Sequence, residues 1–237
     1  GERQNRWVTQ SSWIKTLTST FVRSWDRRTG TSGGLFGGRS KKEGEVLGWS
    51  RAQQAAFLIF AWREFRSAVA ECREDWAIDL RRHPKVGEEK QDRPDDIKAE
   101  DDLAFYSPHS LIVTDQGVRG FLQILNELSY QRAAVLRLNT WLPYERSTAD
   151  PLNAVDYELK SLEEQDFTKF IREICQAMAK FDWRTSSTPG LEETIRRAKL
   201  VFRGSGGYKE LRLQLLEHLA DGESDVAATA TKLLNRS

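Results

Sequence analysis

A glycine-rich turn near the carboxyl end of the chain has the residue types that bind phosphate. Gly204, Ser205, Gly206 and Gly207 precede a predicted helix that starts at Tyr208. The basic residues around this turn are Arg196, Arg197, Lys199, Arg203 and Lys209. Backbone amides at the start of a helix carry partial positive charge and favour an anion. The segment therefore predicts a site for nucleic-acid phosphates, and the alternative is an ordinary turn between helices with a solvated basic face.

A second glycine-rich segment, GGLFGGRS at residues 33–40, has the spacing of the phosphate-binding loop GxxxxGK[ST], with Arg39 in place of the lysine. That loop requires a hydrophobic strand before it and a helix directly after it. Here a predicted helix precedes the segment and the polar residues 41–44 follow it. We therefore expect a surface loop without nucleotide hydrolysis, in which Arg39, Lys41 and Lys42 are candidates for further phosphate contacts.

The chain contains histidine, cysteine and acidic residues, but their spacing matches no known catalytic or metal-binding motif. The three histidines share no ligand spacing, and the two cysteines, Cys72 and Cys175, lie far apart without a CxxC pair. The acidic residues within 92–102 lie in a polar segment that lacks the burial needed to tune a catalytic acid. We expect no catalytic residue, no metal and no cofactor in this chain; the residues favour a protein that is not an enzyme, and the enzyme alternative stays open.

The composition describes a folded protein without a dominant charge. The 237 residues include 36 basic and 35 acidic side chains, so any site for a polyanion must be local. The low cysteine count favours a reducing compartment, and we expect a cytoplasmic protein. The longest apolar run, around residues 55–62, is far shorter than the roughly 20 residues that span a bilayer, so no membrane association is expected.

Hydrophobic periodicity places these residues on a mainly α-helical scaffold of about eight helices with at most two or three short strands. Helices are predicted over residues 11–27, 50–76, 114–128, 191–202, 208–221 and 224–234, and the second of these is the central, buried one. A capping box formed by Ser161 and Glu164 predicts the start of another helix. Residues 103–106 and 111–113 are candidates for short strands, and Gly117 with Gly120 predicts close helix packing.

The charge distribution suggests three parts of the chain. Residues 1–80 form an N-terminal helical part with a glycine-rich loop at 30–48, and residues 103–237 form a C-terminal helical part. Between them, residues 81–102 are densely charged and almost without apolar side chains. Burial cannot offset the entropy of ordering such a segment, so we expect a charged loop or insertion there.

Four blocks, taken in order, resemble the C-terminal half of DGQHR-domain proteins, the family of the DNA phosphorothioation-associated repressor. They are the helix at residues 12–25 leading to GGLF at 33–36, residues 57–76, LIVTDQGVRGFL at 111–122 and FRGSGGYKEL at 202–211. The DGQHR signature itself is absent, so the chain corresponds to the region after it, and no catalytic residue of the family can be assigned here.

The resemblance implies a DNA-binding regulator or accessory protein of a bacterial DNA-modification or phage-defence system. Its expected partners are DNA and protein subunits of that system, with a homo-oligomer as a further possibility. Two alternatives stay open. One is a protein interaction module without direct DNA contact, and the other is part of an enzyme whose active site lies mostly outside this chain.

Overall fold

The computed structural model describes residues 8–22, 34–37, 47–82, 98–143, 151–204 and 206–236. Over these ranges the protein is mainly α-helical, as predicted, and its β-structure is a single isolated bridge between Ser110 and Arg184. Ten α-helices are described, where about eight were expected. The helix predicted over 50–76 divides in two, a short helix replaces the candidate strand at 103–106, and a further helix forms over Pro151–Glu163.

The helices follow one another with short turns between several of them. The α-helices are α1 Gln10–Leu17, α2 Arg51–Glu71, α3 Asp75–Arg82, α4 Leu103–Tyr106, α5 Asp115–Arg132, α6 Pro151–Glu163, α7 Thr168–Ala179, α8 Glu193–Lys199, α9 Gly207–Ala220 and α10 Asp225–Leu234. A π-helical turn, η1 Thr18–Val22, continues α1, and 3-10 turns form at η3 Leu138–Thr140 and η4 Leu200–Phe202.

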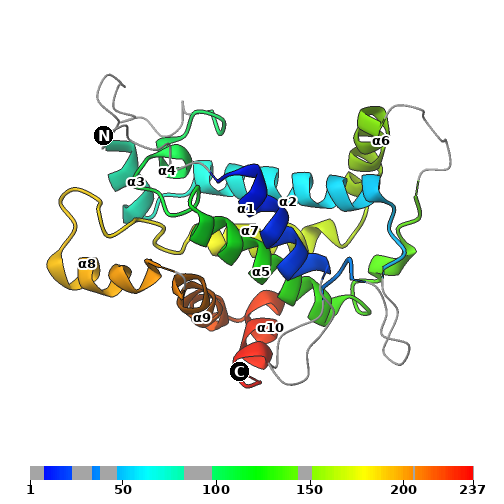
Figure 1. The fold of residues 1–237 in the computed structure, drawn as a ribbon. Coiled ribbons are helices and arrows are strands. Elements are labelled where there is room, and N and C mark those ends of the chain that lie inside the picture. The colour runs from blue at the N-terminus through cyan, green and yellow to red at the C-terminus, as the bar shows by residue number, and fades with distance from the viewer. Residues whose placement is uncertain are drawn as a thin grey trace.

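Helix α2 contributes one buried face to the core, so the prediction of a central, buried helix holds for that face only; residues 59, 63, 67 and 71 on its other side are exposed. A capping box between Ser50 and Gln53 starts it, and α6 and α7 pack against it. Figure 1 shows α2 running across the molecule, with α6 standing beside its N-terminal end. The ring of Phe65, which is fully buried, stacks on Phe121 of α5 with centroids 4.6 Å apart and meets Trp183 edge-on at 5.6 Å. Aromatic side chains thus join α2 to α5.

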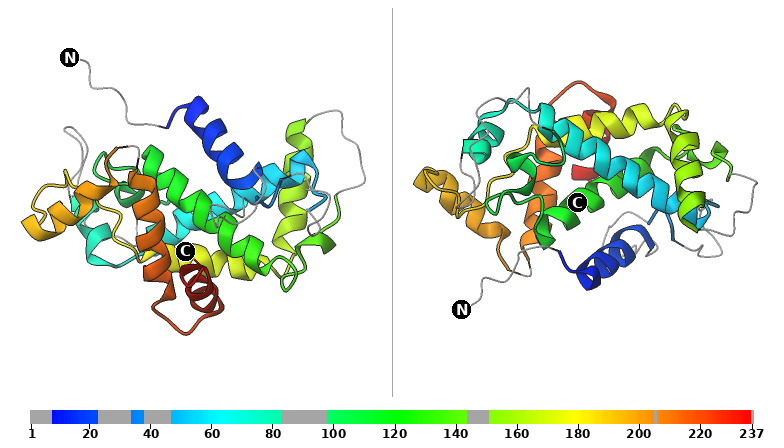
Figure 2. Two further views of the ribbon diagram at one scale, coloured as in Figure 1. Left: turned by 60° about the horizontal axis from the view of Figure 1, so that its bottom comes forward. Right: turned by 90° about the horizontal axis from the view of Figure 1, so that it is seen from above.

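Two glycines let α5 approach its neighbours closely, as their positions predicted. A Cβ atom on Gly117 would lie 1.9 Å from the carbonyl oxygen of Leu111, which is backbone and cannot move aside easily. A Cβ on Gly120 would lie 2.9 Å from Cδ2 of Leu211 on α9. Figure 2 shows α5 between α1 on one side and α9 and α10 on another. Gly120 therefore sets the spacing between α5 and α9, and Gly117 lets the first turn of α5 lie against the backbone of residues 111–112.

Helices on both sides of residues 83–97, which lie outside the described ranges, share one hydrophobic core. Arg81, in α3, and Asp102, the N-cap of α4, form an ion pair whose side chains are 1% and 0% exposed. The expectation of a solvated loop is therefore wrong at both ends of 81–102. Burial of this pair joins the two flanks of the charged segment.

The strand predicted at residues 103–106 is wrong, because this segment is helix α4. The carboxylate of Asp102 accepts a hydrogen bond from the amide of Ala104 and stabilises the helix start. The candidate strand at residues 111–113 is also wrong, because these residues form a bend and a turn. Backbone hydrogen bonds nevertheless join the neighbouring residues 109–111 to residues 183–185. The amide of Leu111 donates to the carbonyl of Trp183 at 2.7 Å, and that of Thr185 donates to His109 at 2.8 Å.

Two further expectations are corrected by tertiary contacts. Ser161 does not start a helix but lies inside α6, where its hydroxyl accepts a hydrogen bond from Nε1 of Trp141 at 3.2 Å; α7 begins only at Thr168. The glycine-rich loop is not a surface loop at residues 34–37, since Leu35 is 2% exposed and its amide donates to Oδ1 of Asn126.

Candidate phosphate-binding site

Arg196 and Arg197, adjacent on α8, have different surroundings. Arg196 bonds to the backbone of the preceding turn: Nη1 donates to the carbonyl of Ser186 at 2.8 Å and Nη2 to that of Leu191 at 3.3 Å. Arg197 is 76% exposed and pairs with Glu193 one turn earlier, with Nε to Oε1 at 2.9 Å. Arg196 therefore stabilises the 186–191 turn, whereas Arg197 lies on the surface.

Lys199 is buried, with 7% of its side chain exposed. Its Nζ donates to the carbonyl oxygen of Asp182 at 2.7 Å and lies 3.3 Å from Oδ1 of the same residue. Burial lowers the pKa of Lys199, and the negative charge of Asp182 opposes that effect. The ammonium group of Lys199 is thus bonded inside the protein and does not belong to an exposed basic surface.

Asp182 belongs to a chain of four alternating charges. Arg184 donates to Asp182 at 2.8 Å and also pairs with Asp79 of α3. Burial alone would raise the pKa of Asp182, but the hydrogen bond from Arg184 and the charge of Lys199 outweigh burial and lower it. The chain of charges from Lys199 to Asp79 fixes the position of the ammonium group. Its members come from distant parts of the sequence, so no local pattern could have indicated it.

The glycine-rich turn before α9 is shaped by two backbone requirements. Gly204 has φ +83°, a conformation that side chains rarely adopt, and a Cβ on Gly207 would lie 2.1 Å from the carbonyl oxygen of Phe202. No side chain of the described residues caps the N-terminus of α9, which follows Gly206. Arg203 and Lys209, two of the predicted phosphate contacts, are exposed beside this turn.

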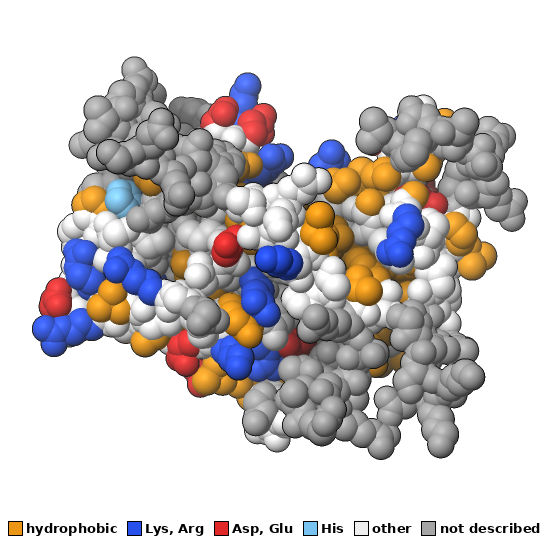
Figure 3. All heavy atoms as spheres, in the orientation of Figure 1, with side chains coloured by type: hydrophobic (Ala, Val, Ile, Leu, Met, Phe, Trp, Pro, Cys, Tyr) orange, Lys and Arg blue, Asp and Glu red, His pale blue; other side chains and the backbone are white. Residues whose placement is uncertain are grey.

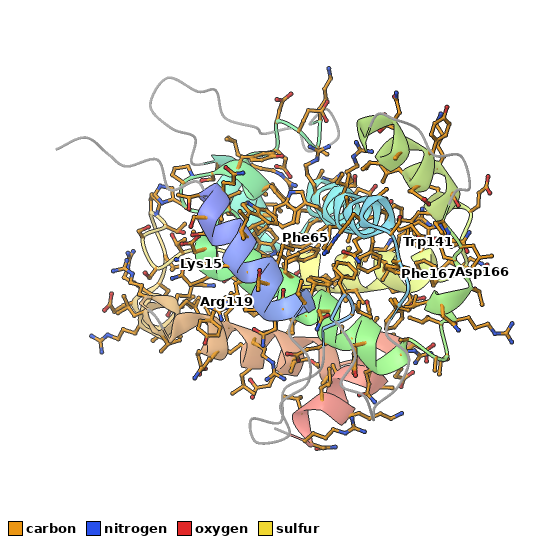
Figure 4. All side chains as sticks on the ribbon, turned by 45° about the vertical axis from the view of Figure 1, so that its right-hand side comes forward. Lys15, Phe65, Arg119, Trp141, Asp166 and Phe167 are labelled. Carbon is orange, nitrogen blue, oxygen red and sulfur yellow. The ribbon has the colours of Figure 1, made fainter. Side chains whose placement is uncertain are left out.

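The aromatic ring of Tyr208 faces α5 and not the solvent side of the turn. The guanidinium carbon of Arg119 lies 3.4 Å from the centroid of this ring, a cation–π contact. Figure 4 shows Arg119 on the same side of the molecule as Lys15, which α1 presents to solvent. Tyr208 thus connects the α9 start to a basic residue that the sequence pattern did not single out.

Lys and Arg side chains form clusters on the face of the protein that Figure 3 draws. Figure 3 shows them over α8 and again over the region where α1, α5 and α9 meet. Among the predicted contacts, Arg197, Arg203 and Lys209 are exposed, whereas Arg196 and Lys199 are bonded internally. The other predicted contacts, Arg39, Lys41, Lys42 and Ser205, lie outside the described residues.

An open cleft of about 510 Å³ adjoins this face. Its walls include the first turn of α5 with Thr114, the segment 185–187 and the stretch from Lys199 to Gly204. The cleft therefore combines two basic side chains, several hydroxyl groups and one carboxylate, that of Asp115. The sequence pattern gave neither Thr114 nor residues 185–187 a binding role, although the run Thr-Ser-Ser-Thr at 185–188 carries a hydroxyl on each residue.

The described part of the chain holds no group of three or more His, Cys, Asp or Glu residues arranged to hold a metal ion. Both cysteines are buried, and burial raises the pKa of each thiol. In the same ranges no helix is long and apolar enough to cross a membrane.

No known protein family, curated protein or solved structure matches this chain.

Proposed function

We propose that this chain binds DNA through phosphate contacts, as a regulatory or accessory protein of a bacterial DNA-modification or phage-defence system. The observation that carries the proposal is the clustering of exposed Lys and Arg side chains on the face that Figure 3 draws. Arg203 and Lys209 flank the start of α9 there, and Arg197 extends the basic surface along α8. The resemblance of residues 202–211 and 111–122 to DGQHR-domain proteins supports the same assignment.

The chemistry of this face suits the DNA backbone and not the base edges. Lysine and arginine on exposed helix positions bind phosphate oxygens and release counterions, which gives affinity without reading sequence. The net charge of +1 means that this attraction is local to the face. We therefore expect modest affinity, a strong dependence on salt and little preference between sequences.

Fluorescence anisotropy with labelled duplex and single-stranded DNA, measured over a series of salt concentrations, tests the proposal. For each phosphate contact, log K falls by about 0.9 per unit of log salt concentration on duplex DNA. Arg203→Ala and Lys209→Ala should each weaken binding to unrelated sequences alike and reduce the salt slope by about one. The matched control is Lys169→Ala, an exposed lysine paired with Asp166 at the start of α7, which should leave affinity unchanged.

Absence of DNA binding even at low ionic strength would refute the proposal. A loss of affinity restricted to one sequence after Lys209→Ala would contradict the assignment of phosphate contacts, because backbone contacts cannot distinguish bases.

A second candidate function is docking of a protein partner through η4. Leu200 and Val201 are 44% and 48% exposed there, next to the basic residues of α8. Exposed apolar side chains bordered by charge are typical of protein interfaces. Sedimentation of the purified chain checks the simplest partner, a second copy: Leu200→Asp should shift an oligomer to the monomer, and a monomer at every concentration would exclude self-association.

A further inference from the structure

We propose that the cleft beside α5 binds a phosphorylated sugar compound of the nucleoside monophosphate class. This inference goes beyond the proposed DNA binding, because the ligand of the cleft is a free small molecule and not a nucleic acid. The argument rests on which chemical groups the walls bring together: a fixed ammonium and an exposed guanidinium, a row of hydroxyl groups, and a single carboxylate. Its volume of about 510 Å³ lies within the roughly 300–1,000 Å³ of small-molecule sites.

The two cations at one part of the wall suit a phosphate dianion. An ammonium group has three donors; that of Lys199, which lines the cleft, donates to the carbonyl oxygen of Asp182 at 2.7 Å and lies 3.3 Å from Oδ1 of the same residue. Arg203 adds a charged donor that is exposed next to it along the wall. Because Asp182 and Arg184 hold Lys199 in place, little side-chain entropy is lost when an anion binds there.

The segment 185–187 supplies neutral donors at fixed positions. The hydroxyls of Thr185 and Ser187 lie 2.9 Å apart, and Arg196 holds the carbonyl of Ser186 between them. Thr188 donates to the carbonyl of Thr185 at 2.8 Å and closes the turn. Hydroxyl groups on such a rigid turn can donate to phosphate oxygens or exchange hydrogen bonds with sugar hydroxyls.

The carboxylate of Asp115 sets the class of ligand. It lies in the first turn of α5 and is exposed to solvent, and a carboxylate repels a bare phosphate but accepts hydrogen bonds from sugar hydroxyls. A ligand that carries both groups can place its phosphate toward Lys199 and Arg203 and its hydroxyls toward Asp115. A phosphorylated sugar is therefore preferred over inorganic phosphate and over an unphosphorylated nucleoside.

Calorimetric titration of the full chain with AMP, CMP, GMP, UMP, ribose 5-phosphate, inorganic phosphate and adenosine tests this proposal. Sugar phosphates should bind at least about tenfold more tightly than inorganic phosphate or adenosine. Arg203→Ala should weaken that binding about tenfold or more, and Ser187→Ala about threefold to tenfold, in line with the loss of a charged and a neutral hydrogen bond. Asp115→Asn should reduce the preference for sugar phosphates over inorganic phosphate.

Control variants separate this site from the DNA-binding face. Lys209→Ala and Arg197→Ala lie outside the cleft walls, so they should weaken DNA binding and leave nucleotide binding unchanged. Ser187→Ala should weaken nucleotide binding and leave DNA binding unchanged. Thermal unfolding confirms that each variant is folded. The proposal is overturned if none of the sugar phosphates binds at millimolar concentration, if inorganic phosphate binds as tightly as they do, or if folded Arg203→Ala and Ser187→Ala variants bind like the unmodified chain.

Discussion

Replacing Arg81 by methionine removes a guanidinium group that caps the carboxyl end of α2. Its Nε and Nη2 donate to the two carboxylate oxygens of Asp102 at 2.9 and 3.0 Å. Nη1 donates to the carbonyl of Cys72 at 2.8 Å, and Nη2 also donates to that of Val69 at 2.9 Å. The last carbonyls of a helix have no intrahelical donor of the usual kind, so Arg81 adds charged donors to the carbonyl of Cys72 and to that of Val69, which also accepts from the amide of Cys72.

The expected loss of stability follows from burial. The two side chains are 1% and 0% exposed, so removing the arginine leaves the Asp102 carboxylate charged and unpaired in the interior. Breaking such a buried pair typically costs about 3–5 kcal/mol of unfolding free energy. Combining Arg81→Met with Asp102→Asn removes the orphaned charge while an amide oxygen still accepts from Ala104. The double variant should therefore recover part of the loss, with a coupling energy of about 1–3 kcal/mol.

Urea unfolding followed by far-UV circular dichroism measures these differences, provided the slope of free energy against urea stays constant among the variants. Arg197→Ala is the control, because it removes an exposed ion pair one helical turn apart, worth about 0.3–0.5 kcal/mol. A loss below about 1 kcal/mol for Arg81→Met, or strict additivity in the double variant, would refute the capping and pairing roles assigned to this residue.

Two further perturbations test the packing and the electrostatics. Gly117→Ala should lower stability by about 1–3 kcal/mol, since its Cβ would lie 1.9 Å from the Leu111 carbonyl oxygen, and an unchanged melting temperature would contradict that close approach. Asp182→Asn tests the lowered pKa of Asp182. Because folding lowers this pKa, the carboxylate stabilises the fold fully at pH values above its ordinary pKa of 3.8, and that stabilisation is lost as the pH falls through the lower pKa of the folded state. The stability difference between the unmodified chain and Asp182→Asn should therefore narrow below pH 3.8, and a difference constant from pH 7 to 3 would contradict it.

Elements whose signals are local could be predicted from the sequence. The helices predicted to begin at 114 and 224 do begin there, because an N-cap involves only the next few residues. The side chains of Thr114 and Ser224 cap α5 and α10 by accepting from the amides of Gly117 and Ala227. Ser161 shows the limit of such patterns. Its spacing from Glu164 matches a capping box, but a contact with Trp141 and continued apolar periodicity through buried Leu162 make it an interior helix residue.

The basic residues could be identified from the sequence, but which of them are exposed and which are bonded internally could not be predicted. Arg196 and Lys199 face carbonyl and carboxylate oxygens of residues 182–191, a relation that depends on how the turn after α7 folds back on α8. The cleft was missed for a similar reason. Its walls come from residues 114–116, 185–187 and 199–204, which only tertiary packing brings together.

The pairing between residues 109–111 and 183–185 has a consequence for the order of folding. Its hydrogen bonds, together with the Ser110–Arg184 bridge, close a stretch of chain that contains all of α5, α6 and α7. Closing a long loop costs entropy before its contacts can stabilise the chain, so we expect this pairing to form after those helices have docked. The two walls of the cleft that flank the pairing would then assemble last, and hydrogen exchange pulsed during refolding should show the amides of Leu111 and Thr185 becoming protected after those of α5, α6 and α7.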